Sequence, residues 1–385
     1  MHFSFVFPTS EGDVLPYIPV GTGPWGIAVD SITNKIYVAC TGSDFPYGKL
    51  SPNGIAVPIP IPGKVFVIDG NNKNITSSIE VGMNPKSIVA NPVTDLIYVA
   101  NENSKSVSVI DGQTNSVVKT MSVGSQPEGL GLDVVSNKIY VANTNSNSIS
   151  VIDGVSNEVI DTIDLENIYP LQVAINDNTN KVYVTDGISN TVLVIDGSTD
   201  KVEESIPAGM STQYIAVNKV TNKIYVAGPS ATLAVIDGMS NKVISTVKIG
   251  EGSSAIAVND IANRIYVTNK NFNTISVIDG STDTYLQQLG TNTPFGIAVN
   301  PKAGTIYTSS YGSASVWITD DSSSHTSNSV YMSPLKQVQS GILPKDVKCK
   351  QNLTLVLKIE NSKPACVKQT SVTRFLAHGW VLTNS

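Results

Sequence analysis

One tripeptide, Ile-Asp-Gly, returns along this 385-residue chain at nearly constant intervals, and this repeat constrains the fold more than any other feature. Its aspartate recurs every 41 to 43 residues, and a degenerate copy ends on a seventh aspartate: Asp69, Asp111, Asp153, Asp196, Asp237, Asp279 and Asp320. A tyrosine in an Ile/Val-Tyr motif recurs in step with it, at Tyr37, Tyr98, Tyr140, Tyr183, Tyr225, Tyr266 and Tyr307. The chain therefore contains seven similar units.

Each unit has the pattern of four short strands. Between Pro85 and Gly124, runs rich in valine, isoleucine and tyrosine alternate with clusters of asparagine, aspartate, glycine and serine. Four antiparallel strands per unit are typical of one propeller blade. The Asp-Gly pair after the third strand and the asparagine of Thr-Asn-Lys are interpreted as residues that take the positive φ of two-residue hairpin loops.

The N-terminal segment is predicted to close the ring. Tyr17–Gly21 (YIPVG) matches the end of a fourth strand but precedes the first complete unit, and the seventh unit has no fourth strand after Asp320. Pairing the two would remove open sheet edges. The sequence thus predicts an all-β fold, with a seven-bladed β-propeller of four-stranded blades over residues 14–320, a polar linker over 321–333 and a small basic C-terminal module over 334–385.

These motifs resemble the YVTN family of seven-bladed β-propellers, whose signature is matched letter for letter by IYVTN at Ile265–Asn269. The resemblance covers Leu15 to Asp320. Members of the family are typically archaeal surface-layer-type proteins or exported bacterial proteins, and most have no assigned reaction. The resemblance implies an extracellular or cell-surface location, although no signal peptide is visible in this chain. No run approaches the roughly 20 apolar residues of a membrane span, so none is expected.

The net charge and its distribution along the chain limit the classes of partner that we expect. The net charge is −6, and only 15% of residues are charged, against about 25% in ordinary soluble domains. Residues 321–385 hold eight Lys/Arg and three Asp/Glu, a net +5, which leaves a net −11 on residues 1–320. An acidic body argues against a nucleic-acid partner.

The positions of the histidines limit the reactions that the propeller is expected to catalyse. His2, His325 and His378 all lie outside the repeats, so the propeller has no imidazole for general-base, haem or metal chemistry. The sequence favours a non-enzymatic binding or scaffolding protein without cofactor or metal, whose partner is a protein or glycan of the cell envelope. One alternative is a propeller enzyme (hydrolase, lyase or redox) that uses carboxylates such as Glu128, Glu166 or Glu251. The other is a single-stranded nucleic-acid binder.

Positions that differ between blades mark the candidate site, because features shared by every blade explain the fold. The residue after the proline, or its equivalent, that begins each first strand is expected at the mouth of the central channel: Trp25, Lys86, Glu128, Leu171, Gln213, Ser254 and Phe295. The first unit separates its tyrosine and aspartate by 32 residues, against 12 or 13 elsewhere, and this insert adds Phe45, Tyr47 and Lys49.

We select as binding candidates Trp25, Phe45, Tyr47, Lys86, Glu128, Gln213 and Phe295. Aromatic rings beside a cation suit a polymer, a sugar or a protein loop. The alternative is that Trp25 and Phe295 plug the channel and that the insert is decoration. The repeated aspartates are interpreted as turn caps, and the repeated tyrosines as core or inter-blade packing.

The C-terminal module contains two cysteines, Cys349 and Cys366, on either side of a predicted strand over Leu353–Glu360. A disulfide between them would close the module outside the cell, and the alternative is two free buried thiols. Ser371–Trp380 is expected to form a short helix. Asn74 and Asn352 begin N-glycosylation sequons, and Cys40 is expected to be a lone buried cysteine. We expect the basic tail to tether the molecule to an anionic envelope component; the alternatives are that it docks on its own acidic propeller or that its lysines only solvate it.

Overall fold

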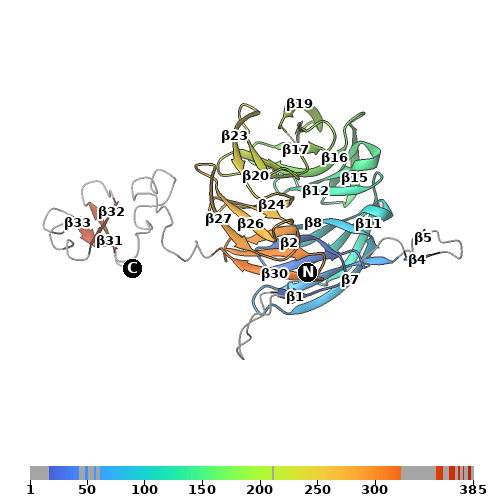
Figure 1. Ribbon diagram of the computed structural model, residues 1–385, viewed down its shortest axis with the longest axis horizontal. Coiled ribbons are helices and arrows are strands. Elements are labelled where there is room, and N and C mark those ends of the chain that lie inside the picture. The colour runs from blue at the N-terminus through green and yellow to red at the C-terminus, as the bar shows by residue number, and fades with distance from the viewer. Residues whose placement is uncertain are drawn as a thin grey trace. The chain divides into compact units, whose positions relative to one another are not determined.

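The computed structural model describes residues 17–42, 48–50, 56–57, 61–209, 212–321, 353–358, 364–368, 372, 376 and 380–382. The chain divides into two compact units, Met1–Asp320 and Asp321–Ser385. The first unit is a ring of seven four-stranded antiparallel sheets, which confirms the predicted seven-bladed propeller (Figure 1). Among the residues described, no helix is long and apolar enough to cross a membrane.

Each blade runs up and down through four strands, and the first strands of neighbouring blades lie against one another around the axis. Blade 1 consists of β2 (Pro24–Asp30), β3 (Lys35–Cys40), β6 (Pro62–Asp69) and β7 (Ile75–Met83). Blade 2 consists of β8 (Pro85–Asn91), β9 (Leu96–Asn101), β10 (Ser106–Asp111) and β11 (Ser116–Ser122). Blade 3 consists of β12 (Pro127–Asp133), β13 (Lys138–Asn143), β14 (Ser148–Asp153) and β15 (Glu158–Asp164). Blade 4 consists of β16 (Pro170–Asn176), β17 (Lys181–Asp186), β18 (Thr191–Asp196) and β19 (Lys201–Pro207).

The remaining blades follow in the same order. Blade 5 consists of β20 (Tyr214–Asn218), β21 (Lys223–Ala227), β22 (Thr232–Asp237) and β23 (Lys242–Lys248). Blade 6 consists of β24 (Ser253–Asn259), β25 (Arg264–Asn269), β26 (Thr274–Asp279) and β27 (Thr284–Gly290). Blade 7 consists of β28 (Pro294–Asn300), β29 (Thr305–Ser310), β30 (Ser315–Asp320) and the N-terminal strand β1 (Tyr17–Pro19). Two short 3-10 helices, η1 (Glu102–Ser104) and η2 (Thr144–Ser146), lie in loops of blades 2 and 3.

Strand β1 closes the ring, as predicted. Figure 1 shows it beside β30, with which it pairs antiparallel. Tyr17 is thereby paired with Trp317, and Ile18 with Val316. The rings of Tyr17 and Trp317 stack with centroids 5.5 Å apart. Because β1 precedes blade 1 and completes blade 7, the two ends of the propeller chain are held together by ladder hydrogen bonds and by a buried Ile18.

The up-and-down order gives the propeller two different faces. The turns between first and second strands and between third and fourth strands lie at one end of the sheets, here called the turn face. The loops between second and third strands, and those between successive blades, lie at the other end, here called the mouth face. The seven repeat tyrosines are buried and tie neighbouring blades together near the turn face.

Three of these tyrosines donate hydroxyl hydrogen bonds across the blade boundaries, and the burial of all seven confirms their packing role. Tyr98 donates to Asn157 Oδ1 at 2.7 Å, and Tyr225 donates to Asp283 Oδ1 at 2.9 Å. The hydroxyl of Tyr140 donates to Asp200 Oδ1 at 2.7 Å, while Lys138 holds the other carboxylate oxygen at 2.7 Å. In each case the acceptor belongs to the turn between third and fourth strands of the next blade.

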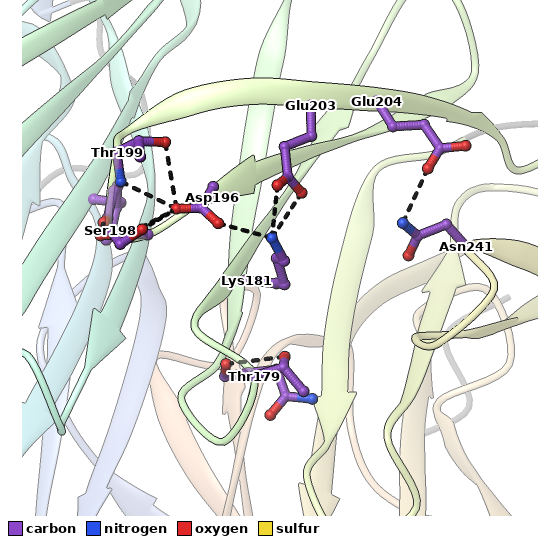
Figure 2. Close-up of polar contacts among 11 residues, drawn as sticks. Thr179, Lys181, Asp196, Ser198, Thr199, Glu203, Glu204 and Asn241 are labelled. Carbon is purple, nitrogen blue, oxygen red and sulfur yellow. Dashed lines mark hydrogen bonds and ion pairs between the residues drawn. The ribbon is translucent and has the colours of Figure 1, made fainter.

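Six of the seven repeated aspartates cap the turns between third and fourth strands, as predicted, and the seventh, Asp320, ends β30 without such a turn. Figure 2 shows Asp196, whose carboxylate accepts from the backbone N–H groups of Ser198 at 3.0 Å and Thr199 at 3.1 Å. Lys181 Nζ lies 2.9 Å from Asp196 and 2.7 Å from Glu203. The hydroxyl of Ser198, together with Lys181 and the backbone N–H groups, holds the pKa of Asp196 well below its usual range.

The prediction for the turn glycines was wrong. In most turns the residue with positive φ is the asparagine or aspartate that ends the turn, such as Asn115 at 52°, and not the glycine of Asp-Gly, while Lys73 and Gly304 take this place in blades 1 and 7. The predicted asparagine of Thr-Asn-Lys does take positive φ, as Asn34 does at 56°. The loop closes over four residues, because Asn115 N–H donates to Asp111 O at 2.8 Å. Glycine is needed for space, since a Cβ on Gly112 would lie 2.0 Å from Asp95 Oδ1 in the adjacent turn of the same blade.

The second unit contains a three-stranded sheet in the order β32 (Pro364–Lys368), β31 (Leu353–Lys358), β33 (Trp380–Leu382). The predicted strand over Leu353–Glu360 is confirmed by β31. Val356, Val367 and Val372 form its small buried cluster. The helix predicted over Ser371–Trp380 does not extend to its last residue, because Trp380 is paired with Lys358 in the sheet.

Candidate functional site

The mouth of the central channel holds a small cavity of about 140 Å³. Four of the seven predicted mouth residues line it, namely Trp25, Lys86, Ser254 and Phe295. In blades 4 and 5 the lining residues are Gln172 and Tyr214, one position after the predicted Leu171 and Gln213. Ordinary small-molecule pockets measure about 300–1,000 Å³. The cavity is therefore too small to enclose a ligand of that size.

Local backbone geometry explains the shift of one position. In most blades the first strand begins with a bulge, for example between Pro24 and Ile27. Blade 5 has no proline and pairs regularly from Tyr214 onward, so Tyr214 takes the lining place. In blade 4, Leu171 packs against its own blade. Its Cδ1 lies next to Gly187, 2.7 Å from the point where a Cβ on that glycine would stand.

Three aromatic rings from blades 7 and 1 form a cluster beside this cavity. The ring centroids of Trp25 and Phe295 lie 4.9 Å apart, with an interplanar angle of 55°. Tyr311, in the loop between β29 and β30, lies 5.8 Å from Trp25 edge-on and 5.3 Å from Phe295. The sequence did not identify Tyr311, because its place depends on how this loop folds over the blade boundary. Such aromatic pairs each contribute about 0.5–1.5 kcal/mol beyond their buried area.

Lysines lie at both ends of the aromatic cluster. Lys86 Nζ of blade 2 lies 3.4 Å from the centroid of the Trp25 ring, and Lys270 Nζ of blade 6 lies 5.6 Å from that of Phe295. Both distances allow attraction between the cation and the ring quadrupole. Lys86 also lies 3.5 Å from Glu102, whereas the structure gives Lys270 no ion pair among the described residues. We call Lys270, Phe295, Tyr311, Trp25 and Lys86 the mouth arc.

Glu128 of blade 3 is half-buried and does not line the cavity, but its carboxyl group interacts electrostatically with Lys86 of the arc. Burial raises the pKa of Glu128, and the charge of Glu102 raises it further, while a 2.8 Å hydrogen bond from Gln126 and the charge of Lys86 oppose them. Burial and the charge of Glu128 raise the pKa of Tyr214 to about 12. Glu102 was not predicted, because it belongs to η1 in a loop. The two carboxyl groups and Lys86 thus influence one another electrostatically.

The other predicted carboxylates are not part of this group. The side chains of Glu166 and Glu251 are exposed. Glu166 adopts a positive φ of 51°, and its backbone oxygen accepts from Asn147 at 2.7 Å. Within the described ranges, no group of three His, Cys, Asp or Glu side chains is arranged to hold a metal ion.

Several predicted residues lie outside the described part of the chain. Phe45 and Tyr47 belong to the blade 1 insert, of which β4 (Gly48–Leu50) and β5 (Ala56–Val57) form a short hairpin between β3 and β6. Cys349, Asn352 and the side chain of Cys366 are also outside it, so the disulfide and the second sequon remain predictions. Asn74 is exposed at the start of β7, and Cys40 is buried as expected.

Comparisons with known proteins identify the fold alone. No protein-family model matches the sequence, and no curated protein matches it. Among solved structures, the chain is similar to hydrazine synthase from Kuenenia stuttgartiensis with a TM-score of 0.67 and 17% sequence identity. The match covers 81% of this chain and 99% of the other. At this identity the shared property is a seven-bladed β-propeller, and the chain has no family assignment by sequence.

Proposed function

We propose that this protein is an exported or cell-surface propeller of the YVTN type that binds a protein or glycan of the cell envelope without catalysing a reaction. The observation that carries the proposal is the mouth arc, in which three aromatic rings lie between two lysines on one rim. Large rigid rings beside cations are the side chains that most often dominate the energy of a binding surface. The match of blade count and closure supports the family resemblance.

The small cavity favours a partner that lies on the rim. A volume of about 140 Å³ holds a few water molecules but not a sugar chain or a cofactor, so a ligand would contact the arc from outside. The exposed sequon at Asn74 is compatible with an extracellular location.

Binding to a glycan array and to purified envelope fractions tests this proposal. The variant Trp25→Ala should weaken binding by about tenfold or more, because truncating a central aromatic anchor commonly costs over 1.4 kcal/mol. Val155→Ala serves as the control, since Val155 is exposed in a turn between third and fourth strands on the turn face. If Trp25→Ala binds as tightly as the original chain, the aromatic cluster is a channel plug and the proposal fails.

A propeller enzyme is the second candidate, because Glu128 combines burial with a neighbouring carboxylate at Glu102. A carboxyl group with a raised pKa can act as a general acid, and a nearby carboxylate can act as its partner. Turnover of a glycan or lactone library that disappears in Glu128→Gln would favour this function over binding alone. The acidic body argues against single-stranded nucleic acid as the partner.

A further inference from the structure

The turn face carries a ring of exposed aliphatic side chains. They occupy one equivalent position in the turn between first and second strands of five blades, and each exposes 65% to 78% of its surface: Ile32, Val93, Val135, Val220 and Ile261. Blades 4 and 7 have Asn178 and Lys302 at this position. We call these seven residues the turn ring. They lie on the face opposite the mouth arc, so they form a separate surface.

The fold does not require aliphatic residues here. The turn uses only the backbone N–H of this position, which Ile32 donates to Asp30 Oδ1 at 2.8 Å and Val93 to Asn91 Oδ1 at 2.9 Å. Lys302 makes the same bond to Asn300 at 3.0 Å, although its side chain is polar. Exposed turns normally carry polar residues, and a repeated set of exposed aliphatic groups on one face is typical of an interaction surface.

The turn ring is continuous from blade to blade. Lys219 Nζ of blade 5 lies 2.8 Å from Asp177 Oδ2 of blade 4, and Lys302 Nζ of blade 7 donates to Ser31 O of blade 1 at 3.3 Å. Asn91 of blade 2 donates to Asn137 of blade 3 at 2.8 Å. Neighbouring turns therefore lie side by side around the axis, in chain order.

Charge on and beside the turn ring is balanced. The residue preceding each ring position is Ser31, Pro92, Val134, Asp177, Lys219, Asp260 or Pro301. Together with Lys302 this gives two acidic and two basic side chains, a sum of zero, whereas residues 1–320 carry a net −11. These fourteen positions therefore carry no net charge, whereas Asp30, Asp95 and Asp133 lie two residues from the ring in the same turns.

We propose that two copies of this chain form a face-to-face dimer through the turn ring. A two-fold axis perpendicular to the propeller axis reverses the blade order, so each blade of one copy meets a defined blade of the other. Only one of the seven possible registers places the two polar positions, Asn178 and Lys302, opposite each other. That register also sets Val220 against Ile261, Val135 against Ile32, and Val93 against Val93 of the second copy.

The same register is complementary in charge. Lys219 of each copy, which keeps its intrachain ion pair with Asp177, comes near Asp260 of the other copy, and Lys302 comes opposite the uncharged Asn178. The two-fold symmetry makes each of these pairs twice. All five aliphatic positions are then covered by aliphatic positions, which gives the apolar centre and polar fringe of an ordinary homodimer interface.

Sedimentation equilibrium of the full chain tests the dimer. We expect a species of twice the chain mass of 40.8 kDa at micromolar concentration. Val93→Asp places two carboxylates opposite each other on the two-fold axis, so the dissociation constant should rise by about 100-fold. Ile188→Asp is the matched control, because Ile188 is 69% exposed in the loop between β17 and β18 on the mouth face. Thermal unfolding by circular dichroism checks that both variants fold.

Mixing two charge variants tests the register. Asn178→Lys alone should dimerise weakly, because the new lysine then meets Lys302 of the other copy twice, and an equimolar mixture with Lys302→Asp should recover the dimer. A wild-type chain that remains monomeric at about 100 µM would overturn the proposal and leave the turn ring to a different partner. A dimer that resists Val93→Asp, or that Ile188→Asp disrupts, would also overturn it. A mixture that does not recover excludes the proposed register.

Discussion

The two faces of the propeller show opposite sequence patterns. On the turn face the same residue types return in most blades, because each one meets a local requirement of the backbone: an aspartate that caps, a glycine that leaves space, an asparagine that accepts positive φ. On the mouth face the equivalent position holds Trp, Lys, Glu, Leu, Gln, Ser and Phe in turn. The blade backbone does not require one residue type at that position, and for this reason we place the proposed binding surface there.

The turn ring is an exception to the rule that residues repeated from blade to blade have a structural role. Its aliphatic residues recur in five blades, yet the turn geometry uses only their backbone N–H groups. Repetition is therefore not sufficient to assign a structural role. A repeated residue is structural when its side chain is buried or hydrogen-bonded, as Tyr140 is, and it remains to be explained when its side chain is exposed.

The largest expected effect comes from comparing the stability that is lost when one aromatic ring is removed from each face. Tyr140→Ala should destabilise the propeller by about 3–5 kcal/mol, because it removes a fully buried ring and the hydroxyl bond to Asp200. Trp25→Ala should cost less than about 2 kcal/mol, since its ring is partly exposed at the channel mouth. Urea unfolding measures both. Equal losses would show that the mouth cluster is as structural as the tyrosine ring.

A second variant tests whether a turn glycine is needed because a side chain would not fit there or because of its backbone conformation. Gly112→Ala should cost about 1–3 kcal/mol, because the new Cβ would lie 2.0 Å from Asp95 Oδ1. Gly290→Ala is the control, since a Cβ there meets nothing within 4 Å and alanine restricts the unfolded chain. The control should be neutral or stabilising by up to about 1 kcal/mol. If both variants unfold at the same urea concentration, the steric explanation is wrong.

The sequence was sufficient for the architecture because the architecture is periodic. Seven tyrosines and seven aspartates in step define seven blades, and the extra YIPVG copy defines the closing strand. Within a blade the turn types are harder to predict from the sequence, because Asp-Gly occurs in hairpin loops of several lengths. The sequence therefore assigned positive φ to the glycine, whereas the four-residue loop places it on Asn115.

Only part of the candidate site could be predicted from the sequence. Trp25, Lys86 and Phe295 were located by alignment of the repeats, because first strands begin at equivalent places. Tyr311 and Lys270 come from loops between second and third strands, and their contacts form across blade boundaries that no alignment of units represents. Leu171 and Gln213 were displaced by one residue, because local strand starts differ in blades 4 and 5.

The smallest expected effect concerns the one turn-face boundary at which both amide positions are acidic. At four boundaries an asparagine that ends a first strand donates to an asparagine of the next blade, as Asn91 does to Asn137 at 2.8 Å. Between blades 1 and 2 the corresponding residues are Asp30 and Asp95. Asp95 Oδ1 is buried without a hydrogen-bond partner. Burial raises the pKa of Asp95, Lys35 opposes this, and the charges of Asp30 and Asp111 add to it.

Asp95→Asn should therefore stabilise the propeller at neutral pH by about 0.5–1.5 kcal/mol, because the new amide can donate to Asp30. The sign of the pH dependence follows from linkage. A carboxyl whose pKa is higher in the folded state binds more protons there, so the stability of the original chain falls as pH rises from the unfolded value near 3.8 through the folded one. The advantage of Asp95→Asn should thus shrink as pH falls toward 4 in urea titrations. Asn137→Asp is the control, because an aspartate there still accepts from Asn91 and should change stability less. An advantage that stays constant from pH 4 to pH 7 would mean that asparagine acts only through its tolerance of positive φ, and not through the charge of Asp95.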